Sequence, residues 1–257
     1  DLFDAVSKRA INQIVTFNSQ GMANTLWAYA SLNCEAPDLF EAFFSSAVTN
    51  LDEYDEQSIG NLLWVLAVMN TNSDKASPLF SFLSTKYQKK NMLLSIELMC
   101  QLHQASLWFT MELGQNSLLP KTLTKECQAA FTSKRTTISK LQKDVIDVFK
   151  FLGYGVKEEV ICTKTGYSID AVIIINGSEV AIEVDGPFHY IGCRPNGKTV
   201  LKRRQLRNLG DRPLVVVPYW EWNQISDRQS NVSNSKQDCF KRKEDYLRTL
   251  LASQQIK

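Results

Sequence analysis

Three acidic residues and a histidine stand close together in this chain: Asp170, Glu183, Asp185 and His189. Neighbouring carboxylates can hold a divalent cation or share a proton, and a histidine beside them can take up or release a proton. Like charges at short range cost free energy unless a cation, a proton or a basic partner offsets them. These four residues are therefore the first candidates for a functional site.

A predicted β-hairpin would bring these residues together. Two apolar runs, Ala171–Ile175 and Val180–Val184, flank Asn176-Gly177, a dipeptide typical of the two-residue turn of a hairpin. Antiparallel pairing about the middle of this turn places Asp170 opposite Glu183. We therefore expect the carboxylates to gather at one end of a small sheet.

The Asp…Glu-x-Asp-Gly-x-x-His pattern resembles the core of the restriction-endonuclease-like fold, in the branch that includes very-short-patch repair endonucleases. Over residues 139–252 the tail resembles a RAP domain, a module related to that fold and associated with organellar RNA. The elements that carry this likeness follow one another along the chain: a helix at Leu141–Leu152, the hairpin ending in Ile182–His189, the stretch Thr199–Leu206, the strand Pro213–Pro218, the aromatic run Tyr219–Trp222 and a helix near Lys243–Leu251. The resemblance implies an α/β endonuclease-like domain over residues 134–257.

The same resemblance implies a metal site, with Asp170 and Glu183 as ligands of Mg²⁺ and with Asp185 and His189 in the catalytic centre if the domain is a nuclease. The nuclease motif ends in Asp/Glu-x-Lys, and its lysine positions the attacking water. This chain has Asp185 at that position. Hydrolysis of a phosphodiester by two metal ions needs a group that orients water, so the sequence leaves enzymatic activity open and favours binding over cleavage.

The first half of the chain repeats itself with a period of about 37 residues. Gln20–Ala30 aligns with Gln57–Ala67, and a weaker third copy begins at Leu94. Each copy continues into a second helix, predicted to open at Pro37 and, after Ser77-Pro78, at Leu79. Residues 1–133 are therefore predicted to form an α-solenoid of helical hairpins. These repeats resemble the heptatricopeptide or octotricopeptide class found upstream of RAP domains.

Charge divides the chain at the same place. Residues 1–133 hold 8 Lys+Arg against 13 Asp+Glu, whereas the remainder holds 21 against 14. Phosphate contact depends on positive charge, and single-stranded RNA is bound by basic side chains interleaved with aromatic rings. The tail offers both, since Phe188, Tyr219 and Trp220 lie near its basic cluster. The residues predicted to contact RNA are Lys198, Lys202, Arg203, Arg204, Arg207, His189, Tyr190 and Trp222. In the repeats, Trp27 and Trp64 are predicted to lie in the core.

Several classes of protein are disfavoured. The sequence has no run of about 18 apolar residues, so no membrane span is expected. Its six cysteines form no Cys-x-x-Cys pair, which argues against a zinc site and a disulfide framework and favours a reducing compartment. We expect neither DNA as a partner nor a cofactor other than Mg²⁺.

The favoured interpretation is an organellar RNA-binding protein that holds or stabilises a specific RNA. Ribosomal RNA is a strong option, which would make the chain a mitochondrial ribosome component or assembly factor with ribosomal proteins as partners. The resemblance implies the mitochondrial matrix or the plastid stroma. Two alternatives stay open: a metal-dependent RNA endonuclease that processes organellar transcripts, and a protein-interaction scaffold.

Overall fold

The computed structural model describes residues 2–71, 73–89, 94–133, 137–227 and 236–253. The chain divides into two compact units. The helical unit comprises Asp1–Lys134 together with Cys193–Gln205, and the sheet unit comprises Arg135–Gly192 and Leu206–Lys257. A mostly helical region thus precedes a small mixed-sheet domain, but a short segment from the second half packs with the first. The assignments to the α-solenoids and to the restriction-endonuclease-like fold stay predictions.

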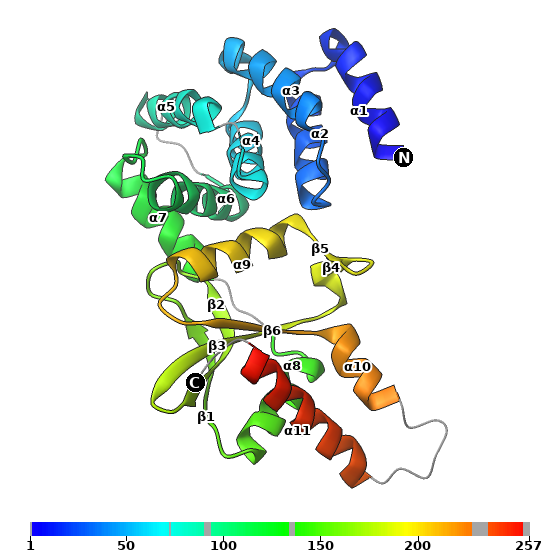
Figure 1. The fold of residues 1–257 in the computed structure, drawn as a ribbon. Coiled ribbons are helices and arrows are strands. Elements are labelled where there is room, and N and C mark those ends of the chain that lie inside the picture. The colour runs from blue at the N-terminus through cyan, green and yellow to red at the C-terminus, as the bar shows by residue number, and fades with distance from the viewer. Residues whose placement is uncertain (1, 72, 90–93, 134–136, 228–235, 254–257) are drawn as a thin grey trace. The chain divides into compact units, whose positions relative to one another are not determined.

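In the helical unit, α2, α4 and α6 pack each on the next but one helix in the chain, and α6 also packs on α7. In Figure 1, α2 lies beside α4 and α4 beside α6, while α1, α3 and α5 form a second row. The elements are α1 (Leu2–Asn12), η1 (Ile14–Thr16), α2 (Ser19–Ser31), α3 (Pro37–Thr49), η2 (Leu51–Glu53), α4 (Glu56–Met69), α5 (Ser73–Lys89), α6 (Ile96–Leu107), η3 (Trp108–Glu112) and α7 (Lys121–Thr132). This alternation of rows is the packing expected of helical hairpins that bury both faces against their neighbours.

Helix caps show the true register of the repeats. Asn18, Asp55 and Ser95 each accept a hydrogen bond from the backbone N–H three residues further on, at the starts of α2, α4 and α6. The caps are 37 and then 40 positions apart. The second copy is therefore aligned as predicted, whereas the third lies three residues later than predicted, so that Gln101 and not Leu98 corresponds to Asn61.

The corrected register is visible as a row of amides. Gln101 Nε2 donates to Asn61 Oδ1 at 2.9 Å, and Asn61 Nδ2 lies 3.5 Å from Asn24 Oδ1. Gln57 Nε2 donates to Gln101 Oε1 at 2.8 Å. Equivalent positions of successive repeats thus contact one another through their side chains.

Two details of the repeat prediction were wrong. Trp64 is 5% exposed, as predicted, but Trp27 is 42% exposed because it lies in the first of the three packed helices and is covered by Trp64 on one side only. Helix α5 begins at Ser73, six residues before the predicted start at Leu79, and contains Pro78. A proline this near the start of a helix removes a single backbone hydrogen bond, which the buried apolar face of α5 offsets.

The sheet unit is built on a four-stranded sheet in the order β1-β2-β3-β6. Strands β1, β2 and β3 pair antiparallel, and β3 pairs parallel with β6. The elements are α8 (Lys140–Phe151), β1 (Gly155–Ile161), β2 (Ser168–Ile175), β3 (Ser178–Asp185), η4 (Pro187–His189), β4 (Tyr190–Ile191), β6 (Leu214–Pro218), α10 (Tyr219–Asp227) and α11 (Lys236–Ser253). Helix α8 packs on the sheet and α11 packs on α8. The short strand β5 (Arg194–Pro195) lies in the helical unit, and α9 (Gly197–Leu209) begins there and ends in the sheet unit.

The predicted hairpin is confirmed. Ile175 pairs with Ser178, so Asn176 and Gly177 alone form the loop, with φ angles of 50° and 82°. Two successive positive φ angles define a type I′ turn, whose twist matches that of the strands. The predicted register also holds, since Ala171 pairs with Ile182.

Candidate functional site

The hairpin brings the predicted carboxylates to one end of the sheet. Asp170 accepts a hydrogen bond from the backbone N–H of Val184, with 2.7 Å between Oδ2 and N. Glu183 and Asp185 lie at the end of β3 and are each 2% exposed. The side chain of Asp170 thus takes part in holding the two strands together just beyond their paired region.

His189 and Tyr190 both contact Asp185. His189 Nδ1 lies 3.2 Å from Asp185 Oδ1, and the Tyr190 hydroxyl donates to Asp185 Oδ2 at 3.4 Å. The turn η4 sets this geometry, because Pro187 opens it and the His189 N–H donates to the Gly186 carbonyl. The structure therefore places three predicted residues, Asp185, His189 and Tyr190, in one neighbourhood of the sheet unit.

A further acidic residue next to this neighbourhood was missed by sequence reasoning. Glu159 interrupts β1 with a φ of 49°, and its carboxylate accepts hydrogen bonds from Gln142 at 2.6 Å and from Ser168 at 3.0 Å. Gln142, 4% exposed, also approaches the carbonyl of Asp170 at 3.4 Å. A left-handed backbone at a residue other than glycine is uncommon and carries no signal in a single sequence.

The resemblance implies Mg²⁺ at Asp170 and Glu183, and the donor set can be tested for its fit. One oxygen of Asp170 already accepts the Val184 N–H, and Asp185 contacts His189. Within the described ranges, no three side chains of His, Cys, Asp or Glu gather closely enough to hold a metal ion together. Magnesium needs a near-octahedral set of oxygen donors. Since Mg²⁺ is usually held by one or two carboxylates together with water and substrate phosphates, Asp170 and Glu183 stay its predicted ligands. The function proposed below uses no metal.

Aromatic side chains cluster at the same edge of the sheet. Because β3 and β6 are parallel neighbours, with Asp185 beside Pro218, the segments that follow them leave the sheet together (Figure 1). Tyr190 lies 4.3 Å from Trp220 between ring centroids, and Tyr219 lies 5.4 Å from Trp220, both edge to face. We call Phe188, His189, Tyr190, Tyr219 and Trp220 the aromatic edge.

Phe188 is the most exposed member of the aromatic edge. Its side chain is 95% exposed, although the residues before and after it are held by the turn η4. The sequence offered a signal here, since Phe188 lies among the aromatic residues near the basic cluster, but the sequence does not reveal which of those rings faces solvent.

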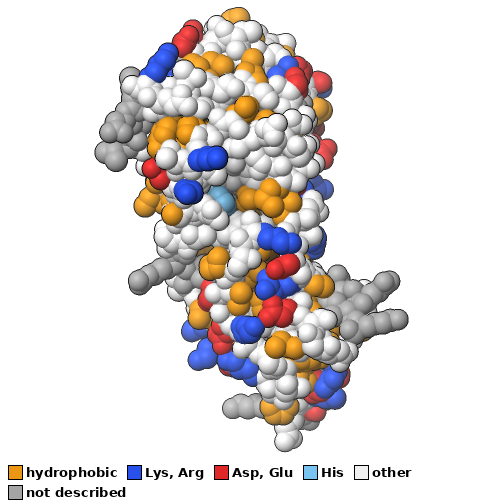
Figure 2. All heavy atoms as spheres, turned by 90° about the vertical axis from the view of Figure 1, so that its left-hand side faces the viewer, with side chains coloured by type: hydrophobic (Ala, Val, Ile, Leu, Met, Phe, Trp, Pro, Cys, Tyr) orange, Lys and Arg blue, Asp and Glu red, His pale blue; other side chains and the backbone are white. Residues whose placement is uncertain are grey.

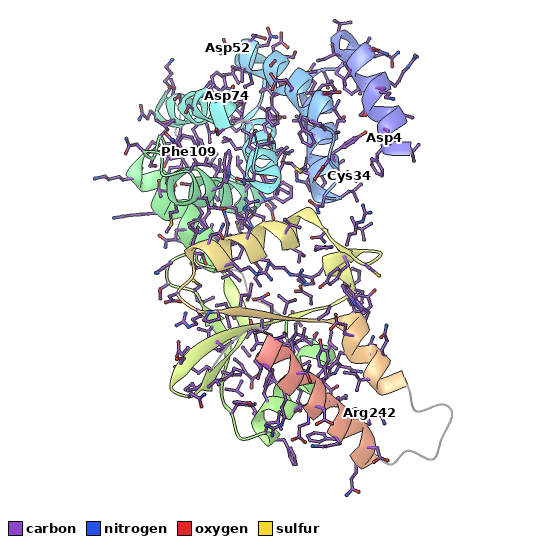
Figure 3. All side chains as sticks on the ribbon, in the orientation of Figure 1. Asp4, Cys34, Asp52, Asp74, Phe109 and Arg242 are labelled. Atoms are coloured by element: carbon purple, nitrogen blue, oxygen red, sulfur yellow. The ribbon has the colours of Figure 1, made fainter. Side chains whose placement is uncertain are left out.

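Trp222 does not belong to this edge, and its predicted contact with RNA is wrong. Its side chain is 1% exposed, its Nε1 donates to Asp144 at 2.7 Å, and Lys243 lies over its ring. A ring packed in the core cannot stack on a base. Lys243 also forms an ion pair with Asp144, with 2.6 Å between Nζ and Oδ2. It lies on α11, the helix that also carries the partly buried Arg242 (Figure 3).

Arg204 lies in the helical unit, where its donors are already engaged. Its Nε donates to Glu112 at 2.8 Å, its Nη1 donates to the carbonyl of Val68 at 3.0 Å, and its Nη2 donates to the carbonyl of Ala67. The last turn of α4 leaves these carbonyls without partners inside the helix. Arg204 therefore caps α4, and its predicted contact with phosphate is not supported by this geometry.

The other predicted basic residues differ in exposure. Lys198 in the helical unit and Arg207 in the sheet unit are exposed, while Lys202 and Arg203 are half-buried. In the face drawn in Figure 2, basic and acidic side chains alternate over the sheet unit. Phosphate contact on that face would rest on individual cations, not on one continuous basic field.

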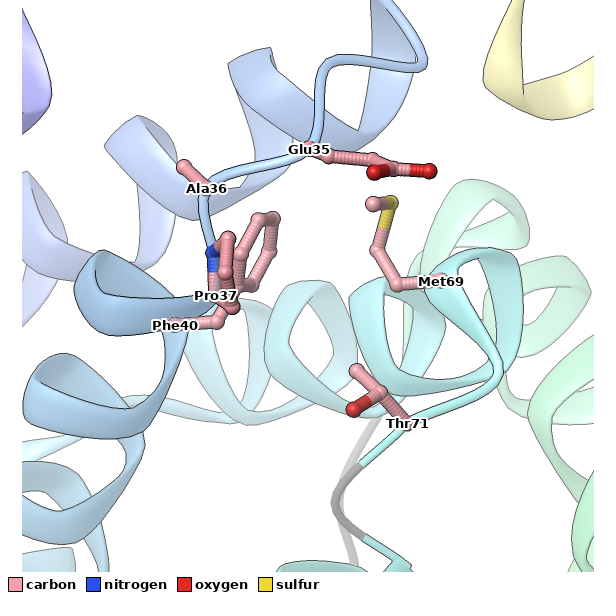
Figure 4. Close-up of a pocket in the computed structure, with 6 residues that line it drawn as sticks. All are labelled: Glu35, Ala36, Pro37, Phe40, Met69 and Thr71. Atoms are coloured by element: carbon pink, nitrogen blue, oxygen red, sulfur yellow. The ribbon is translucent and has the colours of Figure 1, made fainter. Parts of the chain in front are cut away.

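A cavity in the helical unit is too small to be a second candidate for a functional site. Residues Glu35, Ala36, Pro37, Phe40, Met69 and Thr71 line a space of about 220 Å³ in the helical unit (Figure 4). Pockets for small ligands usually measure about 300–1,000 Å³. Among the helices of the described residues, none is long and apolar enough to cross a membrane.

Comparison with known domain families matches residues 182–234 to the RAP domain. This chain contains a RAP domain. The chain is also 25% identical, over 269 aligned residues, to a protein of Oryza sativa subsp. japonica named "RAP domain-containing protein, chloroplastic". That alignment covers 88% of this chain and 41% of the rice protein, so the chain spans less than half the length of this relative.

The RAP match includes Glu183, Asp185 and the whole aromatic edge, whereas Asp170 lies outside it. It also includes α9, so the part of the RAP domain from Cys193 to Gln205 packs within the helical unit. RAP domains are generally RNA-binding modules of organelles.

Proposed function

We propose that this protein binds RNA in an organelle and holds or stabilises it without cutting it. The observation that carries the proposal is the aromatic edge, which lies within the RAP domain. It combines the exposed ring of Phe188 with the half-exposed His189. Recognition of single-stranded RNA uses such rings for stacking, and cations for the phosphates.

In the helical unit, the proposed phosphate contacts are Lys198, Lys202 and Arg203. In the sheet unit, Arg207 contacts phosphate, and His189 and Tyr190 contact the nucleotide. Lys198 and Arg207 carry the greater share because they are the exposed members. Arg204 and Trp222 are left out for the reasons given above. The acidic residues Glu183 and Asp185 are each 2% exposed, so their carboxylates lie below the surface and do not face the phosphates.

The RNA that we propose is a structural one, with ribosomal RNA first, so that the protein would act as a component or assembly factor of an organellar ribosome. The name of the rice relative contains the word chloroplastic. Either a mitochondrion or a plastid therefore suits the proposal.

Binding to RNA tests this proposal through charge reversal. The purified chain is titrated with a fluorescent 20-nucleotide single-stranded RNA of random sequence at several salt concentrations. Lys198→Glu and Arg207→Glu should each weaken binding and reduce the slope of log K against log salt by about 1. Lys125→Glu, a reversal at an exposed lysine of α7, is the matched control and should leave the slope unchanged. Wild-type protein that shows no affinity for RNA at low salt refutes the proposal.

Crosslinking in the native cells tests the finer proposal. If the protein is a ribosome component, crosslinks concentrate at one or two positions of ribosomal RNA. Crosslinks spread over precursor or messenger ends would instead support a processing factor.

A further inference from the structure

Phe188 combines full exposure with a fixed backbone. Its ring is 95% exposed, whereas the next most exposed phenylalanine of the described chain, Phe151, is 71% exposed and packs edge to face on Phe240. Burial of a phenylalanine ring is favourable, so a ring kept in water forgoes that stabilisation. A ring this exposed, on a backbone held in place, points to a role outside the fold.

The turn η4 presents the ring in a defined direction. Pro187 fixes one backbone angle, the His189 N–H donates to the Gly186 carbonyl, and the Tyr190 N–H donates to the carbonyl of Pro187. The side chains that follow are also anchored, since His189 and Tyr190 both contact Asp185. The backbone on both sides of Phe188 is thus held in place. The loop therefore loses little conformational entropy when a ligand stacks on this ring.

The neighbouring rings fix the far side of this loop. Tyr190 packs edge to face against Trp220 at 4.3 Å and lies 6.0 Å from Tyr219. These three rings are each half-buried, so they brace Tyr190 while leaving aromatic surface in reach of solvent. The parallel pairing of β3 with β6 makes this support possible.

We infer that Phe188 is a stacking platform for one unpaired base of RNA, with the half-exposed ring of His189 beside the same nucleotide. This inference rests on the proposed function and adds the class of RNA that the site takes. An unpaired base offers a free π-face, whereas bases inside a duplex are already stacked on one another. The acidic groups that would repel a phosphate are buried beneath the loop. Large contiguous apolar patches mark protein interaction sites, whereas Phe188 is followed directly by His189, which is 41% exposed.

Binding measurements on three variants test the inference. Phe188→Ala removes the ring, Phe188→Trp keeps a ring at the same place, and Phe151→Ala removes an exposed ring elsewhere in the sheet unit. The probes are the fluorescent random-sequence 20-nucleotide RNA and a 20-base-pair RNA duplex. Phe188→Ala should bind the single strand roughly tenfold more weakly, the usual loss for one stacked base. The Trp variant should bind within about twofold of wild type, and Phe151→Ala should be unchanged.

Two further readouts separate stacking from a change in fold or charge. Thermal unfolding of Phe188→Ala should match that of wild type because the ring is exposed. The salt slope should also match, because a base stacked on phenylalanine releases no counterions. Affinity for the duplex should not change.

Each outcome has one meaning. If wild type binds the single strand and Phe188→Ala binds it equally well, the inference is wrong while RNA binding stands, as expected if the ring instead docks onto a protein. If Phe188→Ala loses affinity for single strand and duplex alike, stacking of an unpaired base is also wrong. If wild type binds neither probe, the proposed function itself is refuted.

Discussion

Replacement of Arg204 by alanine should destabilise the helical unit while leaving RNA affinity nearly intact. The guanidinium is 18% exposed and Glu112 is 7% exposed, so the pair is largely shielded from water. Two further donors satisfy the carbonyls of Ala67 and Val68 at the end of α4. Arg204→Ala removes the ion pair with Glu112 and the hydrogen bonds to both carbonyls together.

The expected loss follows from these contacts. Removal of one partner of a buried ion pair costs about 3–5 kcal/mol, and a hydrogen bond to a charged group is worth about 1.5–3 kcal/mol. Because Arg204 keeps some exposure, we expect a total near the lower end, about 3 kcal/mol. At roughly 2–4 °C for each kcal/mol in a unit of this size, the melting temperature should fall by roughly 6–12 °C.

Thermal unfolding followed by far-UV circular dichroism measures this loss, and hydrogen exchange locates it. Exchange should accelerate in the last turn of α4 and in α9. The variant Glu112→Gln removes the other partner, and the double variant should be less destabilised than the sum of the two single variants. Lys75→Ala, which breaks a surface pair with Glu41 in the same unit, is the control and should leave the melting temperature unchanged.

A melting temperature for Arg204→Ala within about 2 °C of wild type would refute this reasoning, since it would correspond to a loss below about 1 kcal/mol. A large loss of RNA affinity in a variant that remains folded would restore Arg204 to the phosphate-contacting residues.

Three other predictions concern stability and reactivity. Hydrogen bonds from Lys157 and Arg212 lower the pKa of Glu179. Its ion pairs therefore stabilise the fold above the usual Glu pKa of about 4.3, and this stabilisation is lost as pH falls below that value. In urea unfolding, Glu179→Gln should lower the free energy of unfolding by about 0.5–1 kcal/mol at pH 7 and leave it unchanged near pH 2. Cys193 is exposed, whereas burial raises the pKa of Cys127 to about 12, so a thiol reagent should label Cys193 first and Cys127 only on unfolding; equal initial labelling of a Cys193→Ser variant would contradict this. Gly197→Ala would place a methyl group 1.9 Å from the carbonyl oxygen of Ala30, so it should destabilise the helical unit by about 1–3 kcal/mol, and an unchanged melting temperature would show that α9 does not approach α2 this closely.

The parts of the fold that the sequence predicted are those specified by local chemistry. Asn176-Gly177 can adopt two left-handed backbone conformations in succession, and the alternating apolar residues around it leave one favourable register. Likewise, the first two repeats have matching polar caps, at Asn18 and Asp55, so their alignment needed no structure.

The parts that the sequence did not predict depend on contacts between distant residues. The third repeat was displaced because α5 has 17 residues whereas α3 has 13, and apolar spacing alone fits a helix at several offsets. Trp27 and Trp64 occupy equivalent positions in α2 and α4. Helix α4 has α2 on one side and α6 on the other, whereas α2 is the first helix of this row, so Trp64 is buried and Trp27 is exposed. Burial of a repeated residue is therefore a property of its place in the array, not of its motif.

The basic run of α9 shows why neighbouring cations cannot be pooled into one site. A helix turns by about 100° at each residue, so Gly197, Leu201, Arg204 and Gln205 share one face at spacings of four, seven and eight residues. Each of the four has a packing role in the helical unit: close approach to Ala30, burial in its core, the cap on α4, and a hydrogen bond from Gln205 to the carbonyl of Gln104. Lys198 lies one residue after the glycine and is exposed. The segment Cys193–Gln205 holds five basic and no acidic residues, while residues 1–133 carry an excess of acidic ones. Part of its charge therefore serves to attach α9 to the repeats, and only the cations that point away from that face are available to RNA.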